Sequence, residues 1–149
     1  MGKQIRDIAV VVQARLSSQR IPEKMIKPFA ETTLFDLAIK KVASSDFIPK
    51  ENFFLSIYED QLIEIAEKYE TNVFLTEMYE WWDKLPFKYC VLVNGCAPFM
   101  KTETIDGFVR AYMNSDSDGM FGVMEKKNYF WNKESELLTP WPDGQACMN

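Results

Sequence analysis

The sequence predicts an α/β fold with a largely parallel sheet. Short apolar runs, typical of strands buried on both faces, alternate along the chain with amphipathic segments of helical period. The 149 residues are 47% hydrophobic and 26% charged, ordinary values for a globular protein, and contain no internal repeat or low-complexity tract. We therefore expect residues 1–149 to form a single domain in which strands are joined by right-handed helical crossovers.

The first predicted strand is the apolar run of residues 8–13, IAVVVQ. A helix follows after a loop, and Thr32 or Thr33 is its expected N-cap because a hydroxyl can accept a hydrogen bond from the first turn. Lys40 and Lys41 are expected on the outside of this helix. The predicted buried stripe consists of Leu34, Leu37, Ala38, Ile39 and Val42.

The second strand is predicted at residues 52–58, and Asp60 is expected to cap the helix after it. A third, short strand is expected at residues 72–75. Residues 76–88 show no clean period and are expected to form a loop or an irregular helix. The inner face of the second helix is predicted to contain Leu62, Ile65, Ala66 and Tyr69.

A fourth buried strand is predicted at residues 89–94, followed by a Gly-Cys-Ala-Pro turn and a helix over residues 102–114. Residues 120–125, MFGVME, are the last expected strand. The tail from Tyr129 onward ends without an obvious closing helix or strand.

Composition excludes several classes of function. The net charge of −5 argues against nonspecific nucleic-acid binding, and the absence of histidine excludes Ser-His-Asp and Cys-His catalysis within this chain. Cys90, Cys96 and Cys147 have no CxxC spacing, so a disulfide framework or zinc site is not expected. No apolar run approaches the roughly 20 residues of a membrane-spanning helix. The N-terminus has no signal-peptide pattern, which predicts a cytoplasmic protein.

The loop after the first strand, within "VVQARLSSQRIPEK", carries an unusual set of polar side chains. Arg15, Arg20 and Lys24 supply three cations, and Ser17 and Ser18 add hydroxyl donors. Ligands of open α/β sheets gather at the carboxyl ends of the strands, and such a donor set suits a triphosphate. The alternative is a solvated surface loop whose charges pair with nearby carboxylates. Neither a Walker A pattern nor GxGxxG is present.

The segment Gln13-Ala14-Arg15-Leu16-Ser17-Ser18-Gln19-Arg20-Ile21-Pro22-Glu23-Lys24 resembles the signature of the sugar-acid cytidylyltransferases. That family includes CMP-sialic acid synthetases and Kdo cytidylyltransferases, and the related SpsF-type nucleotidyltransferases have a similar motif. The shared form is alanine-arginine, a serine three residues after the arginine, then proline and lysine. A weaker similarity continues through "FFLSIYEDQLIEIAEKY" and "YCVLVNGCAPFMKTETIDGF".

The resemblance implies a three-layer, Rossmann-like nucleotide-diphospho-sugar transferase fold and transfer of CMP from CTP to an acidic sugar in surface-glycan synthesis, with release of pyrophosphate. It gives Arg15 and Lys24 the catalytic role of binding and polarising the triphosphate, and it places Asn94 against the sugar. The expected nucleotide-binding residues are Ala14, Arg15, Ser17, Ser18, Arg20 and Lys24.

Magnesium is the cofactor that the resemblance implies, although no ligand for it is identified. Kdo-type enzymes carry a metal-binding aspartate where this chain has Cys96. The expected partners are CTP and a sugar acid, with no nucleic acid and no membrane, and a homodimer is left open. Family enzymes continue past the equivalent of Asp143-Gly144, so the chain is either a fragment or a short relative. Two alternatives stay open: a non-catalytic nucleotide-binding or assembly module, and transfer involving another nucleotide or a neutral sugar.

Overall fold

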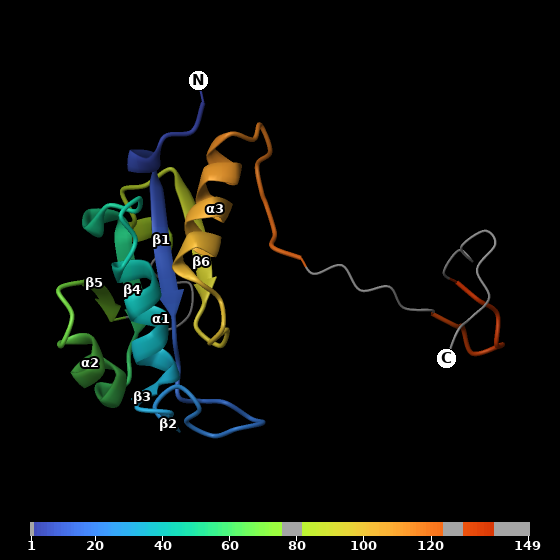
Figure 1. Ribbon diagram of the computed structural model, residues 1–149, viewed down its shortest axis with the longest axis horizontal. Helices are drawn as coiled ribbons and strands as arrows, with labels where there is room; N and C mark the ends of the chain where they lie inside the picture. Colours follow the sequence, from blue (N-terminus) through green and yellow to red (C-terminus); the bar gives the residue numbers. More distant parts are fainter. Residues whose placement is uncertain (1, 76–81, 124–129, 139–149) are drawn as a thin grey trace.

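The computed structural model describes residues 2–75, 82–123 and 130–138. Its centre is a four-stranded, all-parallel sheet in the order β5-β4-β1-β6 (Figure 1). A separate antiparallel pair joins β2 to β3. In chain order the elements are η1 (Ile5–Asp7), β1 (Ile8–Gln13), β2 (Pro28–Phe29), β3 (Thr32–Thr33), α1 (Leu34–Ala43), η2 (Lys50–Asn52), β4 (Phe53–Ile57), α2 (Asp60–Ala66), β5 (Asn72–Leu75), η3 (Trp82–Lys84), β6 (Tyr89–Asn94) and α3 (Thr102–Met113).

The central position of β1 follows from its sequence. Residues 8–12 are all fully buried, as expected of an apolar run without alternation. Alternate β1 residues (Ile8, Val10 and Val12) join the main core, to which α1, α2 and α3 all contribute. The predicted α/β architecture with a parallel sheet is therefore confirmed, and the three helices cover one face of the sheet (Figure 1).

The opposite face of the sheet has its own smaller core. Ala9, Val11 and Phe54 are buried there against side chains from β5, β6 and the segment after η3. The Phe54 ring stacks on Phe74 with centroids 5.1 Å apart and meets the edge of Phe87 at 5.5 Å. The layer on this face, among the described residues, is thus the segment after η3 rather than a helix.

Helix α1 begins where the sequence predicts, with Thr33 as N-cap. The Thr33 Oγ1 accepts a hydrogen bond from the Asp36 N–H at 3.1 Å. The buried stripe differs from the prediction at three positions, because Phe35 is fully buried whereas Leu34 and Leu37 are half-buried. The observed i, i+3, i+4, i+7 stripe consists of Phe35, Ala38, Ile39 and Val42.

Helix α2 corrects two details of the prediction. Glu59, not Asp60, is its N-cap, and the helix ends at Ala66, so Tyr69 lies beyond it. The Tyr69 hydroxyl donates a hydrogen bond to Asp36 Oδ1 at 2.8 Å. Burial, together with this bond to the Asp36 carboxylate, raises the pKa of Tyr69 to about 12. Tyr69 therefore fastens the end of the α2 segment to α1.

The prediction of a strand at residues 120–125 is wrong for residues 120–123, which are the part that the structure describes. Residues 120–123 have no strand structure, and the side chains of Phe121 and Val123 are 87% and 90% exposed. A strand needs a neighbour for its backbone hydrogen bonds, and the described residues provide none at this segment. Residues 124 and 125 lie outside the described residues, as do residues 76–81 of the predicted loop; residues 82–88 hold the 3-10 turn η3 and irregular backbone.

Further along the chain, Trp131 and Leu137 form an isolated antiparallel bridge.

No helix in the described part of the chain has the length and apolar character needed to cross a lipid bilayer.

Asn52 joins the start of β4 to the start of β1. Although the sequence placed it in the strand, it ends η2 and is 2% exposed. Its Nδ2 donates to the carbonyl oxygens of Ile5 and Ile8, at 2.7 and 2.8 Å. Both protons of the amide are thus used where the two central strands begin.

We expect Asn52→Ala to lower the free energy of unfolding by about 1–3 kcal/mol, because two buried carbonyl groups lose their donor. Asn52→Asp should cost at least as much, since a carboxylate faces two carbonyl oxygens. Urea denaturation followed by circular dichroism measures both. The control Asn114→Ala, at an exposed position after α3, should change stability by less than about 0.5 kcal/mol; a loss of that small size in Asn52→Ala would contradict the assignment.

Candidate functional site

The carboxyl ends of β1, β4 and β6 meet at one edge of the sheet. Gln13, the last residue of β1, is in register with Ser56 of β4 and with Asn94 of β6. The loops that follow these strands therefore begin side by side (Figure 1). This edge is where open parallel sheets bind their ligands.

The loop after β1 is held at its base by neighbouring elements. The Ala14 N–H donates to the carbonyl oxygen of Ser56 at 3.2 Å. The Leu16 N–H donates to Glu59 Oε1 at 2.7 Å. The loop closes on itself where the Glu23 N–H donates to the Leu16 carbonyl at 3.2 Å, with Glu23 in the left-handed conformation. The backbone of Leu16 is thus held through both its N–H and its carbonyl oxygen.

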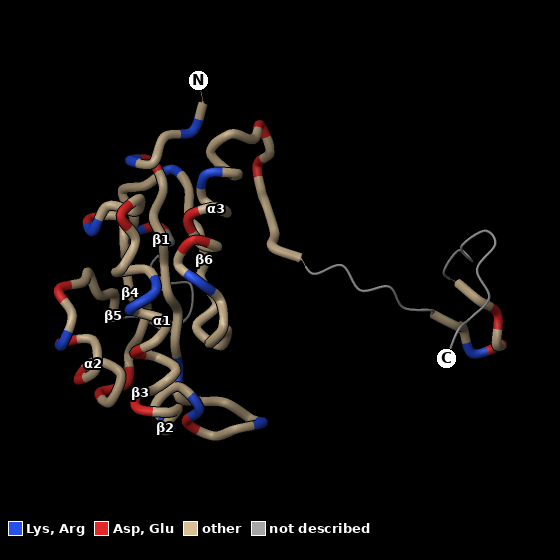
Figure 2. Tube along the Cα trace, in the orientation of Figure 1, with Lys and Arg blue, Asp and Glu red and all other residues tan. Residues whose placement is uncertain are grey.

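The predicted cationic residues lie along this loop. Arg15 and Arg20 are exposed, and Lys24 is half-buried near its end. Figure 2 shows basic segments along the loop beyond the carboxyl end of β1, with one acidic stretch beside them. Ser17 is exposed and Ser18 is half-buried. The loop therefore presents cations and hydroxyl groups on one accessible segment.

Ala14 is only 6% exposed. Its N–H donates to Ser56, which fixes the backbone where the loop leaves β1. The family resemblance implies that the Ala14 backbone lies beside the nucleotide base, and this assignment stays a prediction.

The turn after β6 is organised by Asn94. Its Oδ1 accepts a hydrogen bond from the Cys96 N–H at 2.9 Å, and its carbonyl oxygen accepts one from the Ala97 N–H at 3.3 Å. The exposed Asn94 side chain therefore has a structural task, and its amide nitrogen is the group that remains for a ligand.

Gly95 brings this turn against the end of the β1 loop. A Cβ at Gly95 would lie 3.0 Å from Met25 Cε and 3.6 Å from the Gln13 carbonyl oxygen. The next residue, Cys96, places its Sγ 3.9 Å from Met25 Sδ. A side chain at position 95 would press on the end of the Met25 side chain, so the glycine lets the turn after β6 pack closely against the end of the β1 loop.

Lys41 also shapes this edge of the sheet, although the sequence does not predict this role. The sequence predicts it on the outside of α1, but its Nζ donates to the carbonyl oxygens of Ala97 and Pro98, both at 2.6 Å. Partial burial lowers the pKa of its ammonium group. No local signal marks this role, because the two carbonyl groups come from a loop more than fifty residues away in the chain.

Glu59 is the second missed contributor. While its Oε1 holds the Leu16 N–H, its Oε2 is buried and makes no hydrogen bond within the described part of the chain. The Gln13 Nε2, at the end of β1, is likewise buried and makes no hydrogen bond within the described residues. Glu59 is the second residue after β4, at the same sheet edge as the cationic loop. This position after a predicted strand could have marked it as a site residue.

No three Asp, Glu or Cys side chains come together as a metal-binding group in residues 2–75, 82–123 and 130–138. Cys96, at the position where a carboxylate ligand is expected in Kdo-type enzymes, offers a sulfur, whereas Mg²⁺ prefers carboxylate and water oxygens. No magnesium ligand is therefore assigned among the described residues.

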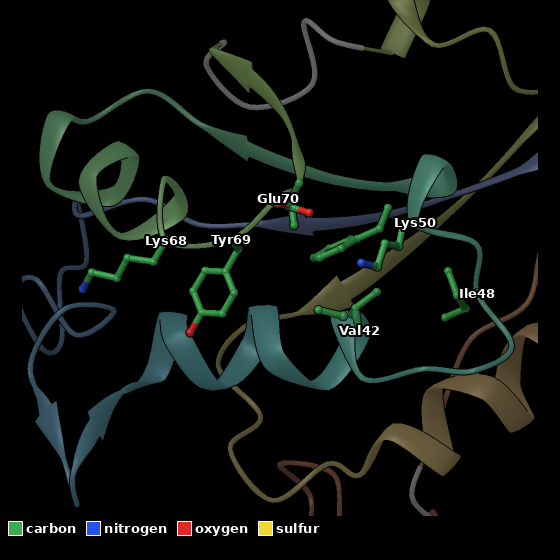
Figure 3. Close-up of a pocket in the computed structure, with 9 residues that line it drawn as sticks. Val42, Ile48, Lys50, Lys68, Tyr69 and Glu70 are labelled. Atoms are coloured by element: carbon green, nitrogen blue, oxygen red, sulfur yellow. The ribbon is translucent and has the colours of Figure 1, made fainter.

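A cavity of about 230 Å³ lies at the opposite end of β4, between the end of α1, η2 and the segment after α2 (Figure 3). Its apolar part includes Val42, Ile48 and Phe53, and Lys50, Lys68 and Glu70 stand around it. The charges at this cavity are mixed, and it is at the amino end of the parallel strands. The carboxyl edge thus remains the better candidate for an anionic ligand.

Comparison with known proteins gives a consistent result. Residues 9–142 match a protein-family model described as cytidylyltransferase. The chain is 24% identical over 127 residues to the spore coat polysaccharide biosynthesis protein SpsF of Bacillus subtilis (strain 168), covering 76% of this chain and 53% of that protein. It is 25% identical over 128 residues to the 3-deoxy-manno-octulosonate cytidylyltransferase of Rickettsia felis, covering 77% and 51%.

Among solved structures, CMP:2-keto-3-deoxy-manno-octonic acid synthetase complexed with CTP superposes with a TM-score of 0.60 at 10% identity. The match covers 70% of this chain and 46% of that one. This likeness supports the fold. The chain spans about half the length of the curated relatives it matches.

We expect the two described thiols to differ strongly in reactivity. Burial raises the pKa of Cys90 to about 12, whereas Cys96 is exposed on the turn after β6. At pH 8 only about one Cys90 in ten thousand is then a thiolate, the reactive form. In a Cys147→Ser background, iodoacetamide should label one thiol rapidly and a second only after denaturation. Adding Cys96→Ser should abolish the rapid phase; a rapid phase that persists would contradict the assignment.

Proposed function

This chain belongs to the cytidylyltransferase family, and we propose that it transfers CMP from CTP to a hydroxyl group of an acidic sugar for surface-glycan synthesis. The observation that carries the proposal is the loop after β1, where Arg15, Arg20 and Lys24 extend from the carboxyl edge of the sheet beside the Asn94 turn. Support for the acidic sugar comes from the relative whose name specifies 3-deoxy-manno-octulosonate, and support for the glycan role comes from SpsF.

In the proposed reaction, the hydroxyl oxygen of the sugar attacks the α-phosphorus of CTP. The bond from that phosphorus to the oxygen bridging the α- and β-phosphates breaks, pyrophosphate departs, and the hydroxyl proton passes to water. Such transfer depends on positioning and on stabilising negative charge, which needs no histidine. Arg15 and Lys24 would bind and polarise the triphosphate, and their cations would balance the charge that develops on the pyrophosphate.

The remaining assignments follow the order of residues in the loop. Ser17, Ser18 and Arg20 would add phosphate contacts, since hydroxyl and guanidinium groups both donate to phosphate oxygens. Ala14, whose side chain is buried, would lie beside the base through its backbone. The Asn94 amide nitrogen would contact the sugar.

Magnesium enters the proposal as the ion that the family typically uses. When bound, it would neutralise charge on the phosphates. No ligand for it is assigned, because the described residues contain no cluster of carboxylates that fits it. We also propose that residues 1–149 form one nucleotide-binding domain and that it acts in the cytoplasm.

A second candidate is a nucleotide-binding or assembly module without catalytic activity. Cys96 favours it, because a sulfur stands where Kdo-type enzymes carry a metal-binding aspartate. The two candidates differ in how CTP binding responds to magnesium. A catalytic site should bind CTP more tightly with the ion, whereas a loop that contacts phosphates through cations alone should lose affinity, because magnesium competes with those cations for the phosphates.

Calorimetric titration of the 149-residue chain with CTP, with and without magnesium and repeated with ATP, tests the proposal. We expect CTP to bind in preference to ATP and magnesium to strengthen the binding. Weaker binding with magnesium would favour the non-catalytic module. If neither nucleotide binds, nucleotide transfer by this chain is excluded.

We expect Arg15→Ala and Lys24→Ala each to weaken CTP binding about tenfold or more, because a charge-assisted hydrogen bond to phosphate contributes about 1.5–3 kcal/mol. Both residues lie in a loop outside the core, so thermal stability should change little. Matched controls are Arg6→Ala and Lys88→Ala, which remove exposed cations near the amino ends of β1 and β6. Affinity in folded Arg15→Ala that equals the affinity of the controls would refute its assignment.

A further inference from the structure

Glu59 occupies the N-cap position of α2 but does not cap the helix. An N-cap side chain usually accepts a hydrogen bond from the first turn, and short side chains are preferred there. The Glu59 side chain makes no such bond. Its longer chain instead reaches across the sheet edge, where Oε1 accepts the Leu16 N–H at 2.7 Å. The residue therefore serves the loop after β1 rather than its own helix.

Leu16 lies between the residues proposed to hold phosphate. Arg15 precedes it, Ser17 follows it, and its carbonyl oxygen accepts the N–H of Glu23 next to Lys24. Leu16 is therefore the residue at which the two ends of the cationic loop meet. Fixing the backbone of a loop residue costs conformational entropy, so a hydrogen bond at Leu16 lowers the entropy that the loop would lose when a ligand binds.

We infer that Glu59 is the positioning residue of the proposed triphosphate loop: by holding the Leu16 N–H it fixes the backbone from which Arg15, Ser17 and Lys24 reach the phosphates. This inference rests on the proposed function for its ligand. Glu59 acts through Leu16 and contacts no phosphate, since a carboxylate beside a triphosphate would repel it.

The alternative role for a carboxylate in a cationic loop is to balance charge, and two substitutions separate the roles. Glu59→Gln removes the charge but keeps an oxygen at the same reach, so it can still accept the Leu16 N–H. Glu59→Asp keeps the charge but is one methylene shorter and cannot reach as far. Positioning predicts that Gln preserves function and Asp impairs it; charge balance predicts the reverse.

The experiment measures two properties of the 149-residue chain and of its Glu59→Ala, Glu59→Gln and Glu59→Asp variants. Hydrogen exchange reports protection of the Leu16 amide, and calorimetry reports affinity for CTP. Glu64→Ala, which removes an exposed carboxylate from the same helix, is the matched control. Exchange at core amides of β1 shows whether any variant has lost global stability instead of loop order.

We expect Glu59→Ala and Glu59→Asp to reduce Leu16 protection about tenfold while β1 amides are unchanged, and to weaken CTP binding about five- to tenfold. Glu59→Gln and Glu64→Ala should stay within about twofold of the original chain in both measurements. Rescue by Gln is the result that a purely electrostatic role does not give.

Three results would overturn the inference: unchanged Leu16 protection in Glu59→Ala, unchanged CTP affinity despite lost protection, or impairment by Gln with normal behaviour of Asp. If the original chain does not bind CTP at all, the proposed function is wrong, and CTP is not the ligand of the loop. In that case the exchange measurement still decides whether Glu59 holds the loop, so the two failures are distinguishable.

Discussion

β1 is buried on both faces, and this burial governs how the other elements are arranged around it. An apolar strand of this kind has to pair on both edges and be covered on both sides, because its backbone and side chains have no access to water. Here β4 and β6 supply the edges, the three helices cover one face, and Phe54 and Phe87 lie on the other. The same pairing aligns Gln13 with Ser56 and Asn94, so it also determines which loops meet at the carboxyl edge.

Three contacts between distant segments then shape that edge. Glu59 holds the loop after β1, Lys41 holds the turn after β6, and Gly95 lets that turn lie against Met25. Each contact joins parts of the chain more than forty residues apart. Cations along one loop repel one another, so these contacts, which hold the backbone in place, oppose the spreading of the loop in water.

Local patterns predicted much of the fold. The strands at residues 8–13, 72–75 and 89–94, the Thr33 cap and the start of α3 all agree with the structure, because each is specified by nearby residues. The prediction of a strand at residues 120–125 was wrong over residues 120–123, since apolar composition does not supply a neighbouring strand. Asp60 was also wrong as a cap, because Glu59 precedes it at the end of the extended segment.

The class of fold, the family resemblance and the cationic loop can all be read from the amino-acid sequence, since residues close together in the chain specify each of them. Asn94 could be placed at the same edge because parallel strands align their carboxyl ends. The contacts of Glu59 and Lys41, the buried amide of Asn52 and the face on which the helices pack are visible only in the folded chain. These features depend on atoms that folding brings within hydrogen-bond distance. Distances between residues far apart in the chain cannot be derived from a local sequence pattern.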